Sequence, residues 1–132
     1  MPHITIECSA NVREIVDLDE LVRRVHATAL ETGVFPIGGL RTRVAERAIY
    51  RIADGDPANA FVHVALRIGH GRDLPTKRRA AAAIFATVCE VLQPAFEATP
   101  LGISLDVQEI DPELSFKQNN LHDYVKSRST AS

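Results

Sequence analysis

The chain has 132 residues, of which 45% are hydrophobic and 24% charged, and its formal net charge is −2. This length predicts a single domain over residues 1–132, and the lack of excess positive charge argues against a nucleic-acid or anionic-membrane partner. No signal-peptide pattern and no run of about 18 apolar residues occur, so we expect a cytoplasmic protein.

The first third of the chain predicts a strand followed by a helix. Residues 2–8 alternate apolar and polar side chains, which is the period of a half-buried strand. Asp17 and Glu20 form a plausible capping pair, after which apolar residues recur at helical spacing. Gly33 should end this helix.

A second extended run is expected from about residue 40 to residue 52, after the turn at residues 36–39. If this strand were unbroken, four arginines would share one side of it, and a bulge would redistribute them. These are Arg41, Arg43, Arg47 and Arg51.

The second half of the chain repeats the same order of elements. Residues 61–68 predict a third strand, apolar enough to be buried on both sides. Asp73 can cap a second helix, and Pro94 should kink or shorten the end of that helix. A fourth strand is expected over residues 103–108, whereas residues 116–121 show no clear period and a frayed tail is expected from about Ser127.

This order predicts an α/β (α+β) fold made of two β-α-β units, over about residues 1–55 and 58–112, with a C-terminal segment at 113–132. Right-handed crossovers would give a four-stranded mixed sheet with both helices packed on one face. A sheet rich in Leu, Ile and Val would then lie bare on its other face, which favours a homo-oligomer.

Pro2 directly follows the initiator methionine, and its chemistry depends on processing. Within the chain its nitrogen is an amide without a proton, and the residue merely opens a strand. If Met1 is removed, Pro2 becomes a terminal secondary amine that can act as a base.

The cysteines, the paired glycines and the histidines give weaker indications of function. Cys8 and Cys89 stand far apart, so we expect small buried side chains in a reducing compartment. The Gly69-x-Gly71 pair fails the dinucleotide pattern because Leu74 replaces the third glycine. The histidines lack the spacing of a metal site, and the one of most interest is His70. They are His3, His26, His63, His70 and His122.

Several separated motifs resemble the 5-carboxymethyl-2-hydroxymuconate isomerase family of the tautomerase superfamily. They lie at residues 1–3 and 7–9, 32–36 and 39–43, 60–63 and 68–72, and 116–120. The resemblance implies a homotrimer with sites near subunit boundaries. It also implies a cofactor-free proton transfer, in homoprotocatechuate breakdown, that converts a dienol tricarboxylate to its oxo isomer.

The resemblance implies that Pro2 is the catalytic base and that Arg41 and Arg72 are catalytic and substrate-binding residues. Two guanidiniums and partial desolvation would favour the neutral amine, and permanently charged planar donors suit carboxylates and a growing dienolate charge. Arg43 could assist as a third cation, while Arg47 and Arg51 would serve solubility or pairing between subunits.

Two other functions stay open at this point. The same proton transfer could act on another oxo acid, for example one like phenylpyruvate. Alternatively, the chain could be a non-catalytic trimeric binding module, which would keep Met1.

Overall fold

The computed structural model describes residues 1–130. The strands are β1 (His3–Ser9), β2 (Arg41–Arg47), β3 (Ala60–Gly69) and β4 (Leu101–Ile110). The α-helices of this described part are α1 (Leu18–Glu31), α2 (Leu74–Ala98) and α3 (Leu121–Thr130). Short 3-10 turns follow β1, precede β2 and follow β4: η1 (Ala10–Glu14), η2 (Ile37–Gly39) and η3 (Pro112–Leu114).

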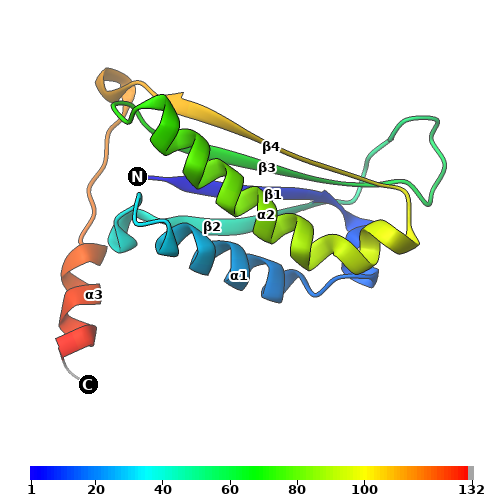
Figure 1. Cartoon of the computed structure of the whole chain (residues 1–132), viewed down its shortest axis with the longest axis horizontal. Helices are drawn as coiled ribbons and strands as arrows, with labels where there is room; N and C mark the ends of the chain where they lie inside the picture. The colour runs from blue at the N-terminus through cyan, green and yellow to red at the C-terminus, as the bar shows by residue number, and fades with distance from the viewer. Residues whose placement is uncertain (131–132) are drawn as a thin grey trace.

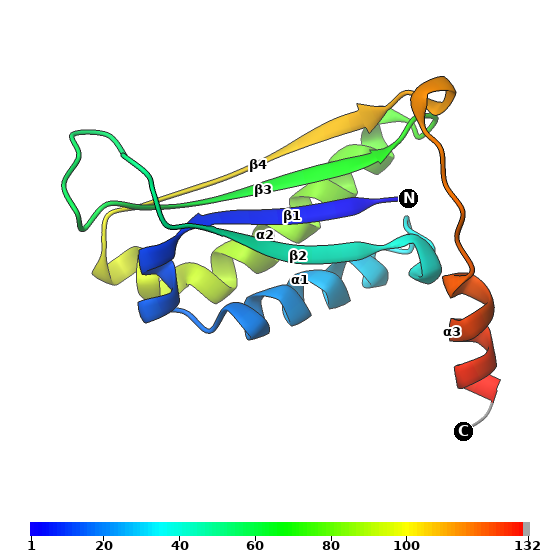
Figure 2. The ribbon, with the colours of Figure 1, turned by 180° about the vertical axis from the view of Figure 1, so that it is seen from behind.

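The four strands form one mixed sheet in the order β2-β1-β3-β4. β1 pairs in parallel with β2, and β3 in parallel with β4, while the two halves meet through the antiparallel β1–β3 pair. Helices α1 and α2 cover the same face of the sheet, whereas the opposite face is open (Figures 1 and 2). The predicted doubled β-α-β arrangement is therefore confirmed.

The core lies between this sheet and the two helices. Every second residue of β1 and β3 points toward the helices and is fully or almost fully buried, including Ile4, Ile6, Val62, Val64 and Leu66. The helices contribute one apolar stripe each, with Leu21 and Val25 from α1 and Ile84, Val88 and Leu92 from α2.

Local signals in the sequence set the helix boundaries as predicted. The Asp17 carboxylate accepts from the backbone N–H groups of Asp19 and Glu20, and Asp73 accepts from that of Thr76. Gly33, with a φ of +72°, follows the end of α1.

Helix α2 is long and apolar enough, by length and composition alone, to cross a membrane. Its buried stripe packs on the sheet, so its place as the core helix accounts for that composition.

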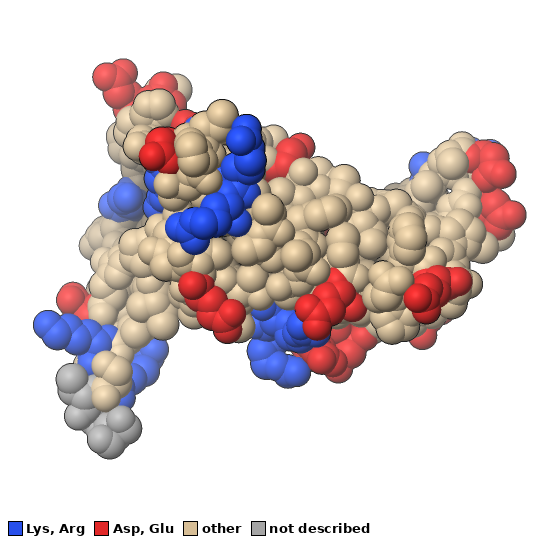
Figure 3. Space-filling view, in the orientation of Figure 1, with Lys and Arg blue, Asp and Glu red and all other residues tan. Residues whose placement is uncertain are grey.

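In Figure 3, basic side chains gather near the end of the molecule where α2 begins, where the sequence carries Lys77, Arg78 and Arg79.

The open face of the sheet is polar, contrary to two predictions. The third strand is buried on one side only: Val62 and Val64 are buried, while Arg67 on the other side is exposed. Thr5, Glu7 and other polar residues share that open face, so Leu, Ile and Val of the sheet face the helices instead. The argument for an oligomer from a bare apolar face is wrong.

The second strand is also shorter than predicted and ends at Arg47 rather than near residue 52. Its neighbour β1 ends at Ser9, opposite Arg47, and the chain then turns into η1, so later residues have no strand to pair with. Arg51 consequently leaves the row of arginines and lies beside Gly55, whose φ is +85°. A Cβ at residue 55 would stand 2.7 Å from the Arg51 guanidinium.

Three expectations about the later chain are wrong. Pro94 does not shorten α2, which continues to Ala98 because burial of Leu92 and Ala95 holds the last turns on the sheet. Cys89 is half-buried rather than buried, although Cys8 is buried as expected. Residues 116–120 have no regular secondary structure, as expected, but Leu121–Thr130 form a helix where a frayed tail was expected from about Ser127; residues 131–132 of that expected tail lie outside the described residues.

Candidate active site

The chain terminus and several element ends meet at one end of the molecule. β1 and β2 begin there because they are parallel, and β3 and β4 end there because they run opposite to β1. The N-terminus of α2 and the C-terminal segment after β4 lie at the same end (Figure 1). Side chains that are far apart in the sequence are thereby brought around the N-terminus.

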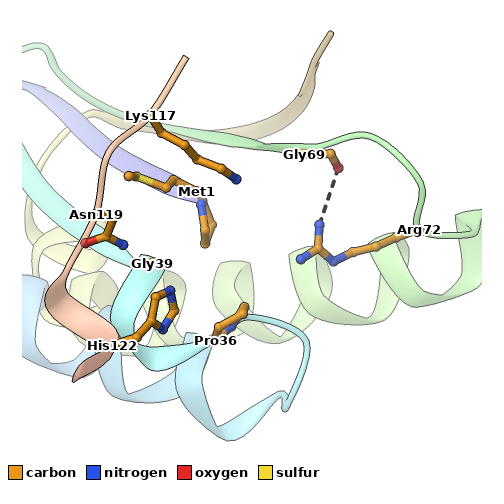
Figure 4. A pocket seen from close by; sticks show the side chains of 9 residues that line it. Met1, Pro36, Gly39, Gly69, Arg72, Lys117, Asn119 and His122 are labelled. Atoms are coloured by element: carbon orange, nitrogen blue, oxygen red, sulfur yellow. Dashed lines mark hydrogen bonds between the residues drawn. The ribbon is translucent and has the colours of Figure 1, made fainter. Parts of the chain in front are cut away.

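A hollow of about 410 Å³ opens at this end. Its lining comes from the N-terminus, the turn before β2, the turn after β3 and the C-terminal segment (Figure 4). The lining residues are Met1, Pro2, Pro36, Gly39, Gly69, Arg72, Lys117, Asn119 and His122.

Pro2 is buried at the inner wall of this hollow. Its carbonyl oxygen accepts a hydrogen bond of 3.2 Å from the backbone N–H of Arg41, which continues the β1–β2 ladder to the chain end. A Cβ at Gly39 would stand 3.4 Å from Cδ of Pro2. The absence of a side chain at residue 39 therefore lets the turn before β2 pass close to the proline ring.

Arg72 lies across the hollow, in the tight turn between β3 and α2 (Figure 4). Its guanidinium donates to the carbonyl oxygens of Gly69 and Val34, each at 3.3 Å. The guanidinium carbon also lies 5.3 Å from the centre of the Phe35 ring, which is nearly buried. These contacts fix the cation without neutralising its charge.

Arg41 lines a neighbouring hollow together with Met1, His3 and Lys117. Its Nη1 donates to the carbonyl oxygen of Gly39 at 3.0 Å and to the Met1 sulfur at 2.8 Å. The structure therefore places Arg72 and Pro2 in one hollow and Arg41 in the next, with Met1 lining both.

The electrostatic setting favours a neutral amine at the chain terminus. Burial lowers the pKa of the Met1 amino group, and the nearby charges of Lys117, Arg72 and Arg41 lower it further. Burial likewise lowers the pKa of His3, helped by Arg43 and Arg41. Any amine at this end of β1 has cations rather than carboxylates as its charged neighbours.

The other candidates from the sequence lie outside the main hollow. Arg43 is exposed on the open face, where it is 3.1 Å from the His3 ring nitrogen. Arg47 pairs with Glu7 of the same chain at 2.8 Å. His70 pairs with Glu109 at 2.7 Å and borders a third hollow that also includes Met1.

The residues that the sequence did not single out for the site are Lys117, Asn119 and His122. They come from the segment after β4 and the start of α3, where hydrophobic periodicity is weak. The motif at residues 116–120, which carries part of the family resemblance, could have indicated Lys117 and Asn119, whereas His122 lies beyond it.

Comparison with known proteins decides the family. Residues 2–125 match the 5-carboxymethyl-2-hydroxymuconate isomerase family. The chain belongs to this family. A 5-carboxymethyl-2-hydroxymuconate Delta-isomerase from Escherichia coli is 39% identical over 126 residues, which cover 96% of this chain and 100% of the relative. Membership makes the chain an isomerase, as the sequence predicted.

The fold agrees with solved structures of the family. A 5-carboxymethyl-2-hydroxymuconate isomerase from Deinococcus radiodurans R1 superposes with a TM-score of 0.87 at 32% identity, covering 94% of this chain and 93% of the other. A native fused 4-OT superposes with a TM-score of 0.66 at 17% identity, covering 94% and 98%. The second likeness is one of fold, and it confirms the predicted tautomerase-like architecture.

Proposed function

We propose that Pro2, once Met1 has been removed, is the base with which this isomerase converts 5-carboxymethyl-2-hydroxymuconate to 5-carboxymethyl-2-oxo-hex-3-ene-1,6-dioate. The observation that carries the proposal is the burial of Pro2 at the wall of a hollow whose charged neighbours are cations. Such surroundings keep an amine neutral, and only a neutral amine can accept a proton.

The reaction moves one proton and needs no other reactant. The Pro2 amine takes the proton of the 2-hydroxyl group, and the O–H electron pair forms the carbonyl while the diene electrons shift along the chain. The protonated amine then returns the proton to carbon 5, so that an O–H bond is exchanged for a C–H bond. The 2,4-diene becomes a 3-ene conjugated with the new carbonyl.

Arg41 and Arg72 take the roles of substrate-binding and charge-stabilising residues in this proposal. Each guanidinium can bind a carboxylate through two parallel hydrogen bonds and can stabilise the negative charge that develops on the 2-oxygen. Their positions in two hollows that share the chain terminus suit a long substrate with several carboxylates.

Met1 stands in the way of this reaction. With Met1 present, the Pro2 nitrogen is an amide, and the Met1 side chain lies between the hollows with its sulfur against Arg41. Removing Met1 would turn the Pro2 nitrogen into a basic amine, release the Arg41 guanidinium from the Met1 sulfur and join the two hollows.

The test compares two forms released from a cleavable fusion, one beginning with Met1 and one with Pro2. We expect the form beginning with Pro2 to isomerise the tricarboxylate and the other to lose about 100-fold or more in kcat, because general-base catalysis contributes ~10²–10⁴-fold. A Pro2→Ala variant, beginning at residue 2, keeps a primary amine and should retain weak activity. Equal activity of the two forms would place the base elsewhere.

The proposal extends to a homotrimer. Large apolar side chains are exposed on the loop after β2 and on the C-terminal segment, namely Ile49 at 97%, Leu114 at 77% and Phe116 at 92%. Two related fused 4-OT folds are described as symmetric trimers. Light scattering of the form beginning with Pro2 should give three times the chain mass, and a monomer at assay concentration would contradict this.

A further inference from the structure

Lys117 occupies a special position among the residues around the chain terminus. It lines both the hollow that holds Arg72 and the hollow that holds Arg41, and Met1 is the other described residue that does so. Figure 4 shows the Lys117 amino group pointing into the cavity, toward the space between Met1 and Arg72.

The backbone on either side of Lys117 is fixed by specific contacts. Before it, η3 follows β4 and the Asp111 carboxylate accepts from the backbone N–H of Glu113. After it, Asn119 donates to the carbonyl oxygen of Gly38 at 3.0 Å and accepts from the N–H of Leu121 at 2.9 Å. The segment is thereby attached to η2, the turn whose Gly39 passes close to the Pro2 ring.

The three cations at this site lack acidic partners. Within residues 1–130, no carboxylate forms an ion pair with Lys117, Arg41 or Arg72, although such pairs form elsewhere on the surface. Positive charges gathered without counter-charges repel one another, and an anion bound between them relieves that repulsion. The number of unpaired cations indicates a ligand with several negative charges.

We propose that Lys117 binds the third carboxylate of the substrate, so that each of the three cations meets one carboxylate. This inference rests on the proposed function, because it takes the tricarboxylate as the substrate. A muconate with a carboxymethyl branch carries one carboxylate more than the unbranched acid. Lys117, on the segment after β4, is a specificity-determining residue for that branch.

A lysine suits this task better than a third arginine would. Its ammonium is a compact charge on a flexible stem, with three donors that can follow a carboxylate on a rotatable branch. Arg41 and Arg72 are instead held by backbone carbonyls and suit carboxylates attached rigidly to the diene.

The experiment uses the form beginning with Pro2 and three variants: Lys117→Met, Lys117→Arg and the control Lys126→Met, which changes an exposed lysine of α3. Each is assayed on the carboxymethyl acid and on 2-hydroxymuconate, which lacks the branch. We expect Lys117→Met to lower kcat/KM for the branched acid by about 10- to 100-fold, because a hydrogen bond to a charged group contributes ~1.5–3 kcal/mol.

The comparison between substrates decides the question. Lys117→Met should leave 2-hydroxymuconate turnover within about threefold of wild type, raise KM more than it lowers kcat, and be rescued in large part by Lys117→Arg. An equal loss on both acids, or no loss on either, would overturn the role of Lys117 while leaving the isomerase activity established.

A binding measurement separates this inference from the proposed function. Calorimetry with propane-1,2,3-tricarboxylate and with glutarate measures the preference for a third carboxylate without any reaction. We expect wild type and Lys126→Met to prefer the tricarboxylate and Lys117→Met to lose that preference. If wild type turned over neither muconate, the proposed function would be wrong, and these titrations would still decide whether Lys117 binds a third carboxylate.

Discussion

Gly38→Ala tests whether the C-terminal segment completes the site. Gly38 lies buried in η2, and a Cβ there would stand 2.6 Å from Cγ and 2.8 Å from Cα of His122, at the start of α3. Real Cβ atoms do not approach other atoms so closely, so α3 or η2 must move. Because one of the atoms is backbone, a new rotamer of His122 alone cannot relieve the overlap.

The magnitude follows from what holds the segment. Overpacking costs about 1–3 kcal/mol, and displacement would also remove the Asn119 to Gly38 hydrogen bond, which contributes about 0.5–1.5 kcal/mol. Among the described residues, none beyond Val107 belongs to the hydrophobic core, so this loss falls on the docking of the segment rather than on the fold. We expect the equilibrium constant for docking of the segment to fall by about 10-fold or more.

The assay is kcat/KM on the tricarboxylate together with thermal unfolding followed by circular dichroism. Gly38→Ala should lower kcat/KM by about 10-fold or more and shift the unfolding midpoint by less than about 4 °C. Gly102→Ala in β4 is the matched control, because a Cβ there meets nothing within 4 Å. Full activity in Gly38→Ala would show that the docked segment, and Lys117 with it, is not needed.

Two further predictions concern stability. Thr28 of α1 and Thr87 of α2 share a hydrogen bond of 2.7 Å between their hydroxyls. Thr87→Val should therefore lower the free energy of unfolding in urea by about 1 kcal/mol, and adding Thr28→Val should recover part of that loss. Strictly additive losses in the double variant would contradict the pairing. The hydrogen bonds from Thr76 lower the pKa of the Asp73 carboxyl in the folded protein below its ordinary 3.8. The carboxylate therefore stabilises the fold above pH 3.8, and this stabilisation is lost as the pH falls through the lower pKa of the folded protein. The unfolding midpoint of Asp73→Ala should lie below that of wild type at pH 7 and approach it in acid, and a gap that persists unchanged in acid would refute this.

The sequence could predict the sheet and the two core helices because their signals are local. Alternation in residues 2–8, the caps at Asp17 and Asp73, and the stop at Gly33 each depend on neighbours a few residues away. Pro2 could be named as a candidate base because a proline directly after Met1 becomes a terminal amine once Met1 is removed.

Other features depended on partners distant in the sequence. The end of β2 at Arg47 is decided by where β1 stops, and the continuation of α2 past Pro94 by the sheet beneath it. No local pattern carries either fact, which is why the sequence placed the end of β2 too late and allowed for an early end of α2 at Pro94.

The sequence by itself determined which chemistry is available: an amine at the chain terminus and arginines at strand ends. The tertiary structure decided which charges surround that amine. Arg41 and Arg72 line two hollows that share Met1, and Lys117 comes to the same place from a segment 115 positions after Pro2. Spatial proximity of these cations follows from the antiparallel meeting of the two halves, and no pattern within either half encodes it.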